Sequence, residues 1–142
     1  MKFQEKIKKK MMKIIEKISK YPVSVLYIII IWVLCFMDVP ETPLNNVTLM
    51  DKWVHIAMYL GTCLTIWFEY ARCHRAMRPQ WLRLAVWAWL APALMSGIIE
   101  LGQAYCTGGR RSGDWYDFIA NTIGCTLAAV IGAIVLKMRR LP

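Results

Sequence analysis

Residues that are costly to place in a membrane gather near the ends of apolar segments in this chain of 142 residues. Their side chains can form ion pairs, exchange protons and bind polar ligands. The set consists of Asp51, Lys52, His55, Glu100, Gln103, Arg111, Asp114, Asp117 and Asn121. All nine are expected near the same face of the membrane, which makes that face the best place to look for a functional site.

One group of these residues lies at the start of the second apolar segment. Asp51 and His55 are four residues apart and Lys52 and His55 are three apart, so each pair shares a helix face. Tyr59 continues the same stripe. His55 is expected about one turn, or ~6 Å, below the interface. A histidine there suits proton transfer near neutral pH.

The third apolar segment offers Ser96, Glu100 and Gln103 on one helix face. An isolated carboxylate in a membrane helix costs about 2.5 to 3.5 kcal/mol on insertion scales. Glu100 is therefore expected to point into a helix bundle. Pro92 and Gly97 precede it and are expected to kink or thin the helix.

The fourth apolar segment places Asp117 and Asn121 above a track of small residues, with Asp114 just before it. Asp114 is expected to be the N-cap. The track consists of Gly124, Ala128 and Gly132, which predicts close approach of a neighbouring helix. The glycines before Asp114 favour a tight chain reversal over a phosphate-binding loop.

The elements that must position these residues are membrane helices, because 58% of the residues are hydrophobic and lie in long runs. The fold class is all-α, with four transmembrane helices expected at about 22–37, 51–70, 83–105 and 115–136. Residues 1–20 have apolar residues at helical spacing among lysines, which predicts an amphipathic interfacial helix; a disordered basic tail is the alternative. Residues 21–142 form a single transmembrane domain.

Charge is distributed unevenly between the segment ends. Of the 18 Lys and Arg residues, 15 fall in residues 1–20, 71–83 and the C-terminal tail. The positive-inside rule therefore predicts that both termini are cytoplasmic and that the polar residues described above face outward. Residues 38–41 lack the small residues of a cleavage site, so the first apolar run is not expected to be a signal peptide.

Several other site types are not expected. The basic residues lie beside apolar spans without interleaved aromatic platforms, so membrane lipids are the expected partner and nucleic acid is not. Five cysteines without a Cys-x-x-Cys pair argue against a structural zinc site, and no disulfide or cofactor is expected. His55 with Asp51, Glu100 and Asp117 resembles a metal-ligand set, but Lys52 and Arg111 would repel a cation, so no metal is predicted.

Three ordered motifs bring these observations together: Asp51-Lys52-x-x-His55-x-x-x-Tyr59, Glu100-x-x-Gln103, and an arginine that precedes Asp117-x-x-x-Asn121-x-x-Gly124. Over about residues 25–136 this pattern resembles the VanZ-like family of small bacterial membrane proteins. Arg110 doubles the motif arginine, and Arg111 is assigned to it because it precedes Asp117 by six residues. The resemblance implies a multi-pass protein of the bacterial cytoplasmic (inner) membrane that is linked to glycopeptide (teicoplanin) resistance.

Three functions follow as hypotheses. The first is an outward-facing pocket for a lipid-linked or glycopeptide-related ligand of the cell envelope, with Lys52, Tyr59, Gln103, Arg111 and Asn121 as binding residues. The second is a membrane-embedded hydrolase or transferase, in which His55 is the general acid or base and Asp51, Glu100 and Asp117 assist. The third is a structural or accessory subunit whose polar residues only hold helices together. The small-residue track of the fourth segment could equally mediate a homo-oligomer.

Overall fold

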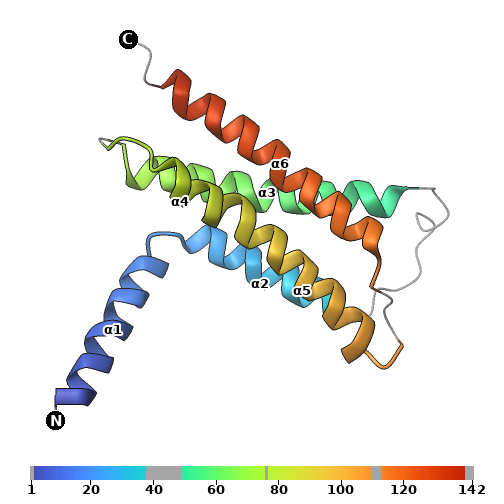
Figure 1. Ribbon diagram of the computed structural model, residues 1–142, viewed down its shortest axis with the longest axis horizontal. Helices are drawn as coiled ribbons and strands as arrows, with labels where there is room; N and C mark the ends of the chain where they lie inside the picture. Colours follow the sequence, from blue (N-terminus) through green and yellow to red (C-terminus); the bar gives the residue numbers. More distant parts are fainter. Residues whose placement is uncertain (1, 38–48, 76, 110–112, 140–142) are drawn as a thin grey trace.

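The computed structural model describes residues 2–37, 49–75, 77–109 and 113–139, and within these ranges every regular element is a helix (Figure 1). The helices run in the order α1 (Lys2–Ile18), α2 (Pro22–Phe36), α3 (Met50–Cys73), α4 (Trp81–Ala85), the π-helical turn η2 (Val86–Leu90), α5 (Ala91–Cys106) and α6 (Trp115–Met138). The all-α prediction is confirmed.

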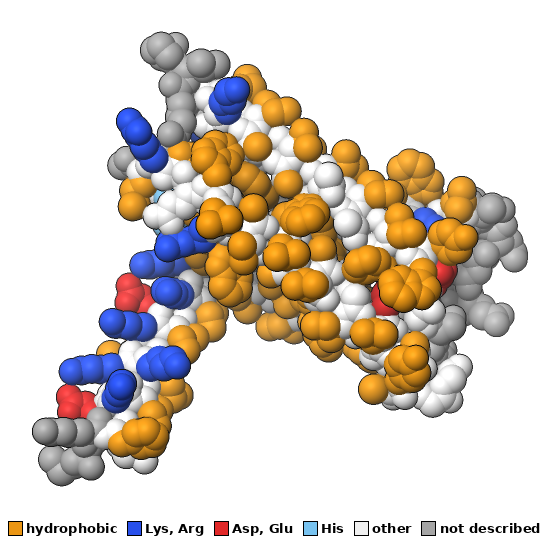
Figure 2. All heavy atoms as spheres, viewed as in Figure 1, with side chains coloured by type: hydrophobic (Ala, Val, Ile, Leu, Met, Phe, Trp, Pro, Cys, Tyr) orange, Lys and Arg blue, Asp and Glu red, His pale blue; other side chains and the backbone are white. Residues whose placement is uncertain are grey.

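The N-terminal helix α1 stands away from the other helices (Figure 1). It meets α2 at an angle of 90°. Apolar side chains such as Phe3 and Met11 are exposed along it. Figure 2 shows hydrophobic side chains along one edge of this helix and basic side chains along the other. Residues 2–18 are therefore helical, as the spacing predicts, and the alternative of a disordered tail is wrong for them.

Among the residues that the structure describes, two helices are long and apolar enough to cross a membrane. They are Trp81–Cys106, with a mean hydropathy of 1.6, and Trp115–Met138, with a mean hydropathy of 2.1. The bent pair of α1 and α2 makes a third if it is counted as one span. Large apolar side chains on these helices are exposed, among them Trp87 and Leu94. Because water does not favour such a surface, the chain is a membrane protein.

The third predicted helix contains a widening that the sequence pattern did not indicate. In η2 the Ala91 N–H donates to the Val86 carbonyl, five residues back. Pro92 follows directly, and its ring would collide with a carbonyl of the preceding turn in a regular α-helix. The π turn relieves this collision, so α4, η2 and α5 continue as one helix of 26 residues.

Helices α3 and α6 pack directly against each other through the small-residue track. A Cβ at Gly124 would meet the Ile56 carbonyl, and one at Gly132 would overlap the Trp67 ring. Ala128 between them is completely buried. The predicted close approach of a neighbouring helix therefore occurs within this chain, between α6 and α3.

Candidate functional site

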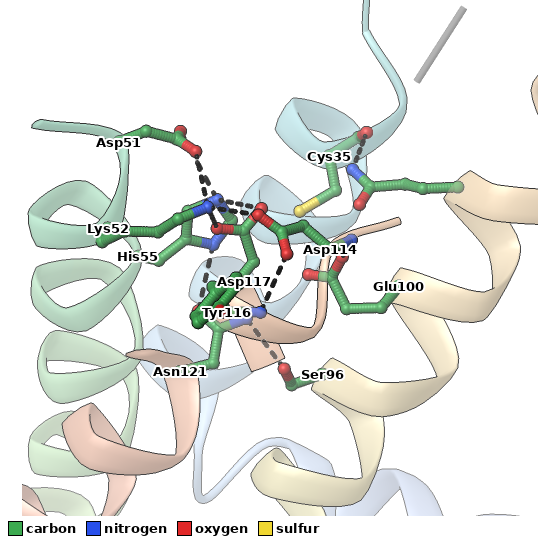
Figure 3. Close-up of polar contacts among 11 residues, drawn as sticks. Cys35, Asp51, Lys52, His55, Ser96, Glu100, Asp114, Tyr116, Asp117 and Asn121 are labelled. Carbon is green, nitrogen blue, oxygen red and sulfur yellow. Dashed lines mark hydrogen bonds and ion pairs between the residues drawn. The ribbon is translucent and has the colours of Figure 1, made fainter. Parts of the chain in front are cut away.

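The N-terminal ends of α3 and α6 meet at a lysine. The Lys52 ammonium lies 2.7 Å from Asp114 Oδ2 and 3.4 Å from Asp51 Oδ2, and it also bonds Asp117 Oδ1 (Figure 3). The residues called the polar cluster below are Asp51, Lys52, His55, Ser96, Glu100, Asp114, Asp117 and Asn121. They come from α3, α5 and α6 and the residue before α6.

His55 lies one turn beyond Asp51 on α3, and both nitrogens of its ring face polar side chains. Its Nδ1 is 3.0 Å from Asn121 Oδ1, and the Asn121 amide nitrogen donates to Ser96 Oγ at 2.8 Å. Since the Asn121 oxygen is an acceptor, His55 Nδ1 carries the hydrogen. Nε2 then faces Asp51 and Asp117, each 3.7 Å away.

Asp114 has two roles. Its Oδ1 accepts from the Tyr116 N–H at 2.9 Å, so it is the N-cap of α6. Its other carboxylate oxygen pairs with Lys52. The hydrogen bond from Lys52, followed by that from Tyr116 N–H, holds the pKa of the Asp114 carboxyl below its usual range. The sequence assigned Asp114 only the capping role.

Glu100 is buried and accepts the Asp114 N–H at Oε2, with a distance of 3.1 Å. It thereby joins α5 to the N-terminus of α6, where a negative charge is favoured by the helix dipole. Gly113 makes this approach feasible, because a Cβ there would collide with the Glu100 carbonyl. Glu100 therefore points into the helix bundle, as expected from the free-energy cost of placing a carboxylate in lipid.

Other predicted site residues lie apart from Lys52. Gln103 is buried, and its amide nitrogen donates to the Cys35 carbonyl at the end of α2, 2.7 Å away. Tyr59 is 1% exposed, and its hydroxyl has no hydrogen-bond partner among the described residues. Arg111 lies outside the described residues, as does Arg110.

Sequence reasoning missed the role of Glu69 on α3. This residue is 1% exposed and accepts the Val23 and Ser24 N–H groups, each at 3.0 Å, and the Ser24 hydroxyl at 2.6 Å. It caps α2 from a neighbouring helix. The sequence does show an acidic residue near the end of an otherwise apolar segment. It does not show the hydrogen-bond partner, Ser24, which is 45 residues away.

The polar cluster has limited capacity for a further cation or anion. Ligand atoms of Asp51, His55 and Asp117 lie within 4.8 Å of one another, which a metal site requires. Lys52 already pairs with both of these carboxylates, so a cation would have to displace its ammonium. An anionic ligand would likewise compete with three carboxylates for Lys52. The absence of a bound metal stays a prediction.

The exposure of the charged side chains in the cluster is highest at Asp51. The Asp51 side chain is 69% exposed, compared with 15% for His55 and 12% for Asp117. Two shallow hollows of the surface lie elsewhere, one along α6 from Phe118 to Leu127 and one between α2 and α3. Asp51 is therefore the residue of the cluster that is most accessible to a ligand.

The chain matches a protein-family model described as VanZ/LLP1 over residues 7–136. No curated protein and no solved structure matches it. The model spans the three motifs that carry the resemblance in the sequence, and it covers most of the chain. The chain therefore belongs to the VanZ/LLP1 family.

Proposed function

We propose that this protein binds a lipid-linked or glycopeptide-related ligand of the cell envelope at the polar cluster, and that this binding contributes to glycopeptide resistance. The observation that carries the proposal is the convergence of Asp51, Lys52, His55 and Asp117 at one partly open point of the bundle. The exposed Asp51 carboxylate can accept hydrogen bonds from hydroxyl or ammonium groups of a ligand.

A purely structural role explains this cluster of charged side chains poorly. Polar contacts between membrane helices average about 0.6 kcal/mol, and α3 and α6 already pack closely through Gly124 and Gly132. The four acids, the lysine and the histidine of the polar cluster add little to that packing and carry a desolvation cost. Ligand binding accounts for these charged residues, whereas helix association does not.

The chain offers a matched pair of histidines for the test. His55→Ala removes the ring from the polar cluster, whereas His74→Ala changes the residue that follows α3 at its opposite end. In cells whose teicoplanin resistance depends on this protein, His55→Ala should reduce resistance to the level of cells without it, with unchanged membrane abundance. His74→Ala should keep resistance. Full resistance of His55→Ala at normal abundance would contradict the proposal.

Catalysis is a second candidate, favoured by the orientation of His55. Asn121 holds Nδ1, so Nε2 is directed toward Asp51 and the open side, where a general base must face its substrate. Ser96 is used by Asn121, which gives no support to a covalent route through it. Purified protein in lipid should then convert an undecaprenyl-linked or phospholipid substrate, and His55→Ala should not. Tight binding without product would leave binding as the function.

We also propose that α2 and α3 cross the membrane beside the two clear spans, which gives four transmembrane helices. Helix α3 has 24 residues, a length of about 36 Å. It packs on α6 at Ile56 and again at Trp67, so it should follow α6 through the bilayer. The 15 residues of α2 span only about 22 Å, and local thinning of the bilayer would accommodate them.

The proposed orientation in the bacterial cytoplasmic membrane places the polar cluster outside and both termini inside. Figure 2 shows Lys and Arg side chains at the end of the molecule that carries α1 and the C-terminal end of α6, here called the basic end. The polar cluster lies at the opposite end. Because positive charge is retained on the cytoplasmic side, the basic end should be cytoplasmic.

A further inference from the structure

A groove of about 410 Å³ lies between α2 and α3 at the basic end. Val23 and Tyr27 of α2 form one wall, and Leu64, Thr65 and Phe68 of α3 form the other. Arg72, one turn beyond Phe68, lies at one end of the groove. Thr65 uses its hydroxyl on the Gly61 carbonyl, at 2.7 Å, so the walls offer mainly apolar surface.

Glu69 also borders the groove, but its charge is already satisfied. Its two carboxylate oxygens accept three hydrogen bonds from Val23 and Ser24 at the N-terminus of α2. A carboxylate in this position is stabilised by the backbone N–H groups and by the helix dipole. It is therefore not available to neutralise Arg72.

Arg72 is exposed and forms no ion pair with the residues that the structure describes. The junction between α1 and α2 lies beside it, because Cys73 Sγ donates to the Lys20 carbonyl at 3.5 Å. Lysines of α1 add further positive charge at this end (Figure 2). The groove thus combines apolar walls with a basic mouth.

We propose that this groove holds one anionic glycerophospholipid from the leaflet at the basic end. An acyl chain would lie between α2 and α3, and the phosphate would be bound by the Arg72 guanidinium, which suits the bidentate recognition of phosphate. The apolar walls require a chain as well as a headgroup, so free phosphate does not fit the site as a whole. The proposal is independent of the function of the polar cluster.

The test compares lipid retention by the full-length protein. After exchange into detergent with equal amounts of phosphatidylglycerol and phosphatidylcholine of the same acyl chains, native mass spectrometry would count the lipids that stay bound. The wild type should retain one phosphatidylglycerol in preference to phosphatidylcholine. Arg72→Gln should lower that preference about fivefold, because a basic residue near an anionic surface contributes about 1 kcal/mol.

The control is Arg75→Gln, which removes the same charge from an exposed residue at the same end that does not line the groove. It should keep the preference, and inorganic phosphate should not displace the lipid. Thr65→Phe fills the groove and leaves Arg72 in place, so it should reduce retention of the lipid. Equal retention of the two lipids by the wild type would overturn the proposal, as would equal losses in Arg72→Gln and Arg75→Gln.

Discussion

Lys52 decides how the residues of the polar cluster are arranged. The sequence places it beside His55 on α3 and predicts it as a ligand-binding residue. In the structure its ammonium is shared among Asp51, Asp114 and Asp117. Lys52 therefore fixes the N-terminus of α6 against α3, and the exposed Asp51 carboxylate is the group that is most open to a ligand.

The pairing of Lys52 with Asp114 should depend on pH. The pKa of Asp114 lies below its ordinary value of 3.8, so the pair contributes stability above that pH and loses it as the pH falls through the lowered pKa. Asp114→Asn keeps a capping side chain but removes the charge. The variant should be less stable than the wild type at pH 6 by up to about 1 kcal/mol, because the pair is partly exposed.

Thermal unfolding in detergent at pH 6 and at pH 3 would measure this difference. The gap between the wild type and Asp114→Asn should shrink at the lower pH, because below the ordinary pKa of 3.8 the Asp114 carboxyl of the wild type takes up a proton on unfolding. Asp51→Asn is a suitable control, since Asp51 is more exposed and lies farther from Lys52. A gap that stays the same at both pH values would show that the charge of Asp114 is unimportant for stability.

At the scale of elements, α3 is the helix that connects the two ends of the molecule. The first turn of α3 contributes side chains to the polar cluster, and Glu69 near the C-terminal end of α3 caps α2. Between them it packs on the glycines of α6. The small-residue track was also the basis for predicting a homo-oligomer. Because the track is occupied by α3 of the same chain, association between copies would need another surface.

The contact between α3 and α6 should be sensitive to a single methyl group. Gly124→Ala places a Cβ against the Ile56 carbonyl, which is backbone and cannot move aside without shifting α3. Overpacking of this kind typically costs 1 to 3 kcal/mol. Gly61→Ala is the matched control, since its Cβ would make an ordinary contact of 3.7 Å with Tyr27. Unfolding in mixed micelles should show a loss for Gly124→Ala only, and equal stabilities would contradict the described packing.

At the scale of the whole molecule, two exposed cysteines lie at opposite ends. Cys106 ends α5 near the polar cluster, and Cys73 ends α3 at the basic end. The other three cysteines are buried. If the polar cluster faces outward, a membrane-impermeant maleimide added to intact cells should label the wild type and Cys73→Ser but not Cys106→Ser. The opposite result would place the polar cluster in the cytoplasm.

The sequence by itself determined the helical class and nearly all helix positions, because lipid leaves the backbone no hydrogen-bond partners outside a helix. Long apolar runs therefore had to be helices, and the predicted window 115–136 lies within α6. It also pointed to every residue of the polar cluster, since helical spacing shows which side chains share a face. These features depend on neighbours within a few positions of the chain.

Only the tertiary structure decided which faces meet. Helical spacing does not give the rotation or the neighbours of a helix, so it could not show that Gln103 contacts Cys35 or that Glu69 caps α2. The pairing of Lys52 with Asp114 joins residues 62 positions apart and depends on how closely Gly124 lets α6 approach α3. Such contacts are set by packing between distant segments, and therefore the sequence provided the components of the site and the packing of α3, α5 and α6 arranged them.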